Sequence, residues 1–144
     1  MTLLANIVAT SQAIAGTSSR RAKATAIATC LRALAPDEID IAVACLAGEI
    51  RQGRIGIGWA AIRDARPAGA MDAPSLTLHE VDAALDAIAS TSGRGSASAR
   101  LDILRSLFVR ATRDEQDFLM RLLIGELRQG ALEGLMVGTP FFVA

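Results

Sequence analysis

The hexapeptide Gly48-Glu49-Ile50-Arg51-Gln52-Gly53 recurs as Gly125-Glu126-Leu127-Arg128-Gln129-Gly130, 77 residues further along the chain. Upstream, an offset of 74 aligns residues 13–18 with residues 87–92. Two copies are too few for a solenoid, so the repeat predicts a compact pseudo-twofold domain of two units, at about 1–66 and about 75–137. The offset of 77 also aligns three further pairs: Asp37-Glu38 with Asp114-Glu115, Ser19 with Ser96, and Lys23 with Arg100.

Each unit has the sequence signals of three helices and the start of a fourth. The capping box Thr77-Leu78-His79-Glu80 predicts a helix to about Thr91, and a second helix is expected at about 98–111. The capping box at 112–115 opens a third helix to about Leu127, which we expect Gln129-Gly130 to end. The first unit repeats this order, with Pro36-Asp37-Glu38 as the helix start. Because no run of alternating residues requires a sheet, the predicted fold class is all-α, a helical bundle of two duplicated units.

Composition limits the class of protein. The 144 residues fit one domain, and 51% are apolar but only 3% aromatic, so aliphatic side chains must fill the core. No stretch approaches the ~18 apolar residues of a membrane span, and residues 1–15 lack the basic start of a signal peptide. Cys30 and Cys45 lie in apolar helical stretches, which predicts buried thiols in a reducing compartment. We expect a cytoplasmic, nucleoid-associated protein without a membrane partner.

Charge is balanced overall but segregated along the chain. Lys+Arg and Asp+Glu are both 15, so net charge alone indicates no partner. However, most charged residues in 20–32 and 94–110 are basic, whereas all the charged residues in 80–86 are acidic. A neutral protein with charge distributed in this way can still present one basic face to phosphate.

Lys23 and Arg100 each fall near the middle of the apolar stripe of a predicted helix, close to its N-terminal end. One interpretation is a side chain that extends to solvent or pairs with a buried carboxylate. The other is that both helices direct their N-termini, together with the cation, toward phosphates. Two interpretations also remain open for three turns, the glycine-rich turn at 92–96 and the Arg-Gln-Gly turns at 51–53 and 128–130. Their glycines either serve ordinary turn formation or allow a close approach to a nucleic-acid backbone.

Other conspicuous residues indicate structural roles. Glu49 and Glu126 are expected to pair with an arginine, and Trp59 to anchor a core or hinge rather than stack on a base. His79 lies in the first turn of a predicted helix without catalytic partners, which favours a surface role. Neither cysteine has metal-ligand spacing with this histidine, so no metal site is predicted.

Residues 17–31, the turn at 92–96 and the run from Glu115 to Gly130 resemble the N-terminal domain of ATP-dependent DNA ligases, and most of all that of the actinobacterial enzymes. The resemblance covers roughly residues 1–137. It implies an all-α, pseudo-twofold bundle that grips nicked duplex DNA across the minor groove. The nucleotidyltransferase and OB domains of such a ligase carry out the chemistry of DNA repair, replication or recombination.

The resemblance also implies which residues contact DNA. Because phosphates carry no sequence code and the minor groove a poor one, binding is expected to be independent of sequence. The implied contacts in the second unit are Gly93, Arg94, Gly95, Ser96, Arg100, Arg128, Gln129 and Gly130, and those in the first unit are Arg20, Lys23, Arg51 and Gly53.

The chain departs from the family pattern in two ways. The adenylation motif Lys-x-Asp-Gly is absent, since the only lysine, Lys23, precedes Ala24-Thr25-Ala26. We therefore expect no catalysis and no cofactor here, because ATP and magnesium would belong to separate catalytic domains. Residues 138–144 form an apolar tail unlike the family's continuation, as a truncated gene, a frameshift or an isolated domain would produce.

Two alternative functions remain open from the sequence. The chain could be a helical protein-interaction module that docks through Phe141-Phe142. It could also be a fragment that complements separately encoded ligase catalytic domains.

Overall fold

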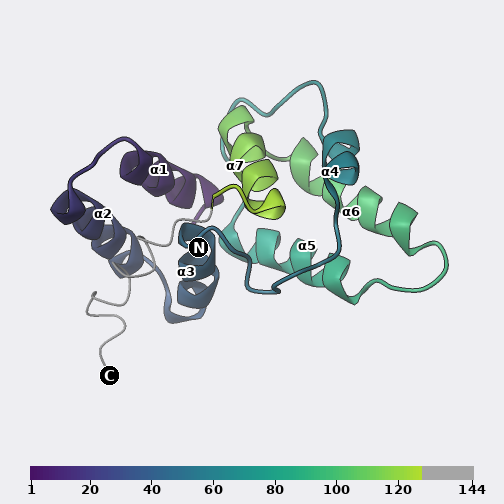
Figure 1. Cartoon of the computed structure of the whole chain (residues 1–144), viewed down its shortest axis with the longest axis horizontal. Helices are drawn as coiled ribbons and strands as arrows, with labels where there is room; N and C mark the ends of the chain where they lie inside the picture. The colour runs from purple at the N-terminus through teal and green to yellow at the C-terminus, as the bar shows by residue number, and fades with distance from the viewer. Residues whose placement is uncertain (128–144) are drawn as a thin grey trace.

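The computed structural model describes residues 1–127. This part of the chain is all-α, as predicted, and contains no strand, only two isolated bridges. Figure 1 shows the helices in chain order. They are α1 (Leu4–Ala15), α2 (Arg20–Arg32), the 3-10 turn η1 (Pro36–Glu38), α3 (Ile39–Leu46), α4 (Trp59–Ala65), α5 (Leu78–Ser90), α6 (Ser96–Val109) and α7 (Arg113–Ile124).

The capping boxes begin helices where the sequence predicted. Thr77 accepts a hydrogen bond from the backbone N–H of Glu80 at 3.1 Å, and Thr112 accepts one from Glu115 at 3.2 Å. The predicted end of the last helix was wrong. Helix α7 stops at Ile124 because Gly125 adopts a left-handed conformation (φ 81°) and closes the helix as its C-cap. The predicted stop at residues 129–130 lies outside the described residues.

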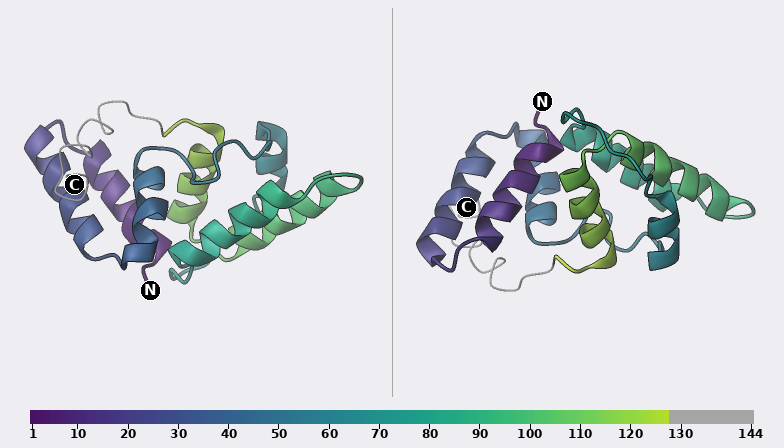
Figure 2. Two further views of the ribbon diagram at one scale, coloured as in Figure 1. Left: turned by 90° about the horizontal axis from the view of Figure 1, so that it is seen from below. Right: turned by 90° about the horizontal axis from the view of Figure 1, so that it is seen from above.

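Two helical hairpins lie at opposite ends of the molecule. Helix α1 packs on α2, and α5 packs on α6, as the short connections between antiparallel helices require. Figure 2 shows the α1–α2 hairpin at one end and the α5–α6 hairpin projecting at the other. Helix α4 belongs to the first unit in sequence, but it packs on α6 and α7 of the second. The segment between α3 and α4 therefore crosses from one unit to the other.

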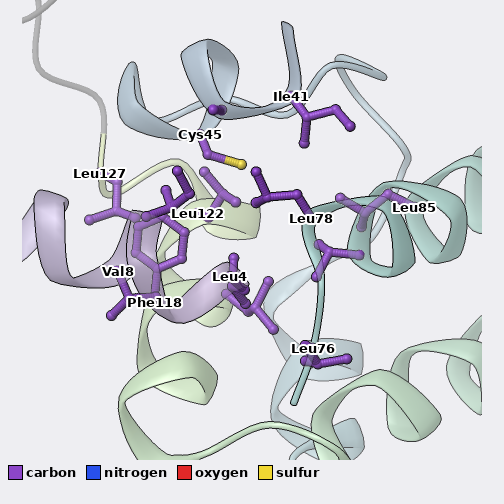
Figure 3. Packing of buried hydrophobic residues seen from close by; sticks show 14 of the residues in the cluster. Leu4, Val8, Ile41, Cys45, Leu76, Leu78, Leu85, Phe118, Leu122 and Leu127 are labelled. Atoms are coloured by element: carbon purple, nitrogen blue, oxygen red, sulfur yellow. The ribbon is translucent and has the colours of Figure 1, made fainter. Parts of the chain in front are cut away.

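One hydrophobic core joins the two units. Figure 3 shows side chains from α1, α3, α5 and α7 converging, among them Leu4, Cys45, Leu78 and Phe118. Phe108 of α6 is fully buried, and the remaining core positions are almost all aliphatic. The low aromatic content therefore predicted the composition of the core correctly. Because both units contribute to one core, neither buries its apolar face alone.

The starts of the two units contact each other reciprocally. Leu3 and Thr77 form an antiparallel bridge, and the offset of 74 residues makes them equivalent positions. The Leu4 N–H donates to the Leu76 carbonyl and the Leu78 N–H donates to the Thr2 carbonyl, both at 2.9 Å. Replacing each residue of one bond by its equivalent 74 positions away gives the other bond, as a twofold relation between the units would require. That relation itself stays a prediction.

Two side chains are more exposed than the sequence suggested. Trp59 begins α4 with 52% of its surface exposed, so it is not a core anchor. Cys45 is buried as predicted, and burial raises the pKa of its thiol to about 12. Cys30 is only half-buried, although burial still raises its pKa.

Candidate nucleic-acid interface

Several arginines are held by carboxylates within the domain. Arg66 of the linker after α4 pairs with Asp117 of α7 at 2.5 Å, and Arg110 at the end of α6 pairs with Glu80 of α5. The hydrogen bond from Arg110, together with those of the helix cap, lowers the pKa of Glu80 to about 2. These arginines join helices to one another, so their charge is already compensated.

Arg51 is compensated in the same way. Its Nε and Nη2 each lie 3.0 Å from a carboxylate oxygen of Asp82, and Nη2 lies 2.6 Å from Asp86. The amide of Gln52 donates to both acids, at 2.9 and 2.8 Å. The acidic stretch on α5 thus fixes the turn after α3. Arg51 is therefore paired within the domain, although 42% of its side chain is exposed, and Gly53 two residues later is exposed as well.

Most of the remaining cations have no partner in the described part of the chain. Within residues 1–127, several make neither an ion pair nor a side-chain hydrogen bond. Four lie on α2, two in or just before α6, one in the loop before α4 and one on α7. These unpaired cations are Arg20, Arg21, Lys23, Arg32, Arg54, Arg94, Arg100 and Arg121.

The start of α6 has the features of an anion-binding helix end. Gly93 and Gly95 both adopt positive φ values (92° and 78°), and Gly95 is the N-cap without any side-chain cap. Several first-turn N–H groups of α6 therefore lack a side-chain acceptor, and such groups bind anions readily. Arg94 is exposed in the same turn, and Ser96 is the first residue of the helix. The structure thus brings together the residues that the sequence singled out here.

The start of α2 is less open. The Ser19 side chain caps it by accepting from the Ala22 N–H at 3.1 Å. Arg20 is exposed and Lys23 half-buried, both unpaired within the described part of the chain. The two helix starts lie at opposite ends of the molecule (Figure 2). A ligand that touches both must extend along the long axis.

Arg100 is half-buried one turn into α6, next to the loop before α4. Its Nε is buried without a hydrogen-bond partner, and it pairs with no acid in residues 1–127. The predicted alternative of a buried carboxylate partner is therefore wrong for this arginine in the described structure.

A groove of about 590 Å³ lies between the turn that follows α3 and the C-terminal end of α7. One wall includes Glu49, Gly53 and Arg54, and the other is the end of α7 from Leu122 to Gly125. Gly53 (φ 72°) faces open space, since a Cβ atom there would meet nothing within 4 Å. The candidate contacts Arg128, Gln129 and Gly130 lie outside the described residues.

Nothing in residues 1–127 indicates a different chemistry. No group of three or more His, Cys, Asp or Glu residues in this range could hold a metal ion. His79 is partly exposed, and its Nε2 lies 3.1 Å from a carboxylate oxygen of Asp37, a contact that the sequence did not predict. None of the described helices is long and apolar enough to cross a membrane.

Sequence reasoning missed Arg54 and Gly56. Both belong to the run Gly53-Arg54-Ile55-Gly56-Ile57-Gly58, whose three glycines could have marked it as a loop of unusual backbone. The sequence could not show that this loop lies against α6, where Gly56 approaches Arg100.

Known proteins provide an independent comparison. The chain is 53% identical over 137 residues to a probable DNA ligase of Mycobacterium marinum and 50% identical over 134 residues to one of Rhodococcus jostii. A probable DNA ligase of Anaeromyxobacter is 52% identical over 135 residues. These alignments cover 93–94% of this chain but only 26% of each relative. The chain thus spans about a quarter of the length of these relatives.

The match to a protein family covers more than half of the chain. Residues 60–139 match the family described as "DNA ligase N terminus". This range covers α4 except for Trp59 and all of α5 to α7, including the start of α6 and Arg100. On the match and the identities together, this chain belongs to the DNA ligase N-terminal domain family.

Proposed function

We propose that the chain binds duplex DNA at a nick, independently of sequence, as the DNA-clamping domain of an ATP-dependent DNA ligase. The division of the cations carries this proposal. Arg51, Arg66 and Arg110 are held by carboxylates, whereas the cations at the starts of α2 and α6 are left for an external anion. Unpaired arginines next to free helix N–H groups suit phosphate.

The separation of the two helix starts favours an extended ligand. A free nucleotide is too short to reach both ends of the molecule (Figure 1), whereas a duplex lying along it offers phosphates at each end. Contacts of this kind position a protein on DNA without specifying sequence.

Binding of a labelled nicked duplex, followed by fluorescence anisotropy at several salt concentrations, tests the proposal. If Arg20, Lys23, Arg94 and Arg100 each neutralise one phosphate, the logarithm of the association constant should fall with the logarithm of salt at a slope of about −3.6. Two unrelated sequences should give the same affinity. Absence of binding at about 50 mM salt would contradict the proposal.

We further propose that catalysis belongs to the rest of a ligase. The probable DNA ligases to which this chain is similar are about four times as long as the matched region. Incubation of the chain with labelled ATP and magnesium should leave no adenylate on the protein. Addition of separately produced catalytic domains tests the complementation hypothesis, since ligation should then increase with the concentration of this chain.

A further inference from the structure

The loop before α4 reaches from the first unit to α6 of the second. Gly56 lies in this loop, and its backbone faces the guanidinium of Arg100. Arg54, two residues earlier, is exposed and has no ion-pair partner among residues 1–127. Gly56 lines the groove that Arg54 also lines, and it lines a second hollow next to Arg100. Gly56 thus borders two hollows, one lined by the unpaired Arg54 of the first unit and the other by the unpaired Arg100 of the second.

Because Gly56 has no side chain, the guanidinium of Arg100 can lie directly against its backbone. A Cβ atom on this residue would lie 3.2 Å from Nη2, 3.5 Å from Nη1 and 3.8 Å from Cζ. All three neighbours belong to the guanidinium, so a side chain here would displace the charged end of Arg100. The positive φ of 70° is a second reason for glycine, because L-residues are strained in that region.

Among residues 1–127, no acid pairs with Arg100. Its Nε is buried without a partner, and a buried donor without an acceptor is costly. Arg66 is also half-buried, yet it has Asp117 at 2.5 Å. The contrast indicates that Arg100 is placed for an anion from outside.

The size of the hollow limits what that anion can be. It measures about 110 Å³ and is lined by Gly56, Ile57, Ala61, Arg100 and neighbouring residues of α6. Small-molecule pockets are usually ~300–1,000 Å³, so a nucleotide does not fit inside. A phosphate group projecting from a polymer backbone can approach it from solvent.

We propose that Arg54 and Arg100 form one binding site for a backbone phosphate of DNA, with Gly56 as a positioning residue. The site joins the two units, since Arg54 comes from the first and Arg100 from the second. This inference rests on the proposed DNA-binding function and adds two residues to it, Arg54 and Gly56.

The test uses the whole chain, a nicked duplex and the salt series described above. Because the site binds one phosphate, loss of both arginines should reduce the magnitude of the salt slope by about 0.9 and weaken binding about eightfold at 0.1 M salt. Arg54→Ala and Arg100→Ala should each give part of that loss. Arg105→Ala is the matched control. It removes the same charge from the same helix, about 140° around the axis from Arg100. Its ion pair with Asp102 is weak, because the two groups are 3.9 Å apart and both side chains are exposed. Its binding should be nearly unchanged.

A double-mutant cycle tests the role of Gly56. Gly56→Ala should weaken binding in the wild-type background because the new Cβ displaces Arg100. In the Arg100→Ala background the same substitution should have no further effect on affinity, since no guanidinium is left to move. Thermal unfolding of all four proteins ensures that affinities are compared below every melting transition.

The outcomes separate this inference from the proposed function. Salt-dependent binding that Arg54→Ala and Arg100→Ala leave unchanged overturns the site while DNA binding stands. An equal loss with Arg105→Ala overturns it too, because the effect would then be one of net charge. An additive effect of Gly56→Ala in the Arg100→Ala background overturns the positioning role. If wild-type protein does not bind at low salt, both proposals fail together.

Discussion

Replacing Glu38 by glutamine should destabilise the domain far more than the same change at Glu115. The two glutamates are equivalent in the repeat, and both are buried (2% and 1% exposed). Each accepts a hydrogen bond from the backbone N–H three residues earlier, at 2.9 Å from Ala35 and 2.8 Å from Thr112. They differ in how their remaining acceptor capacity is used.

Glu38 has a partner for each oxygen. Oε2 accepts from the Thr2 N–H at 2.7 Å, and Oε1 accepts from the Thr2 hydroxyl at 2.8 Å. Glu115 Oε2 is buried with no partner. The residue equivalent to Thr2 is Leu76, which has no hydroxyl. An amide at Glu38 would therefore place one N–H group against another, whereas at Glu115 it would break no hydrogen bond.

The expected costs follow from this difference. Losing a charge-assisted hydrogen bond at Glu38 should lower the free energy of unfolding by about 1.5–3 kcal/mol, against less than about 1 kcal/mol at Glu115. For a domain of this size the larger loss is a fall in melting temperature of roughly 5–10 °C. Removing a negative charge from a helix start affects both variants alike, so it cancels in the comparison.

Urea unfolding at neutral pH, followed by helical circular dichroism, measures both losses. The m-value should be the same for both variants and the wild type, because the surface exposed on unfolding does not change. An equal or larger loss in Glu115→Gln would refute the reasoning.

Burial alone would raise the pKa of Glu38, but its hydrogen bonds and the positive N-terminus outweigh burial and lower it. Its contribution should therefore be full above the unfolded pKa and disappear as the pH falls through the folded value.

Three further outcomes follow from the described residues. Because the pKa of Glu80 is lowered to about 2 by Arg110 and the helix cap, its stabilising effect should be complete above about pH 4.5 and be lost as the pH falls toward 2, which acid unfolding of Glu80→Gln checks. Cys45, with its pKa raised to about 12, should not react with a thiol reagent at neutral pH before unfolding, whereas Cys30 should react slowly. Trp59, the only tryptophan, should be quenched readily by acrylamide because half of it is exposed.

Features encoded within a few residues could be predicted from the sequence. Both capping boxes form, and the helices that follow them begin within two residues of the expected positions. A box is a local device in which the cap and the third residue satisfy each other's backbone groups, so no tertiary information is needed. The end of α7 was missed because the sequence offers two glycines, Gly125 and Gly130, as possible stops. The left-handed conformation of Gly125, which ends the helix, is not encoded in the repeat pattern.

Features that depend on distant contacts could not be predicted. The repeat made Arg51 a candidate and passed over Arg54 three residues later. Their surroundings differ because α5 brings Asp82 and Asp86 to Arg51, whereas Arg54 is exposed. Trp59 was expected to anchor a core or a hinge because most tryptophans are largely buried, yet at the start of α4 half of its surface is exposed.

A net charge of zero is compatible with DNA binding because the acids and the unpaired cations are separated in space. Glu38 and Glu115 are buried in helix caps, and the acids on α5 are paired with Arg51 and Arg110. Exposed acids that pair with no cation in residues 1–127 lie on α3, in the linker before α5 and at the ends of α7, and none lies on α2. Asp102 of α6 is exposed and lies 3.9 Å from Arg105. Interactions between exposed charges are screened beyond about 8 Å at physiological salt. A phosphate approaching the start of α6 therefore responds to Arg94 and Arg100, and little to the acids elsewhere that balance the total.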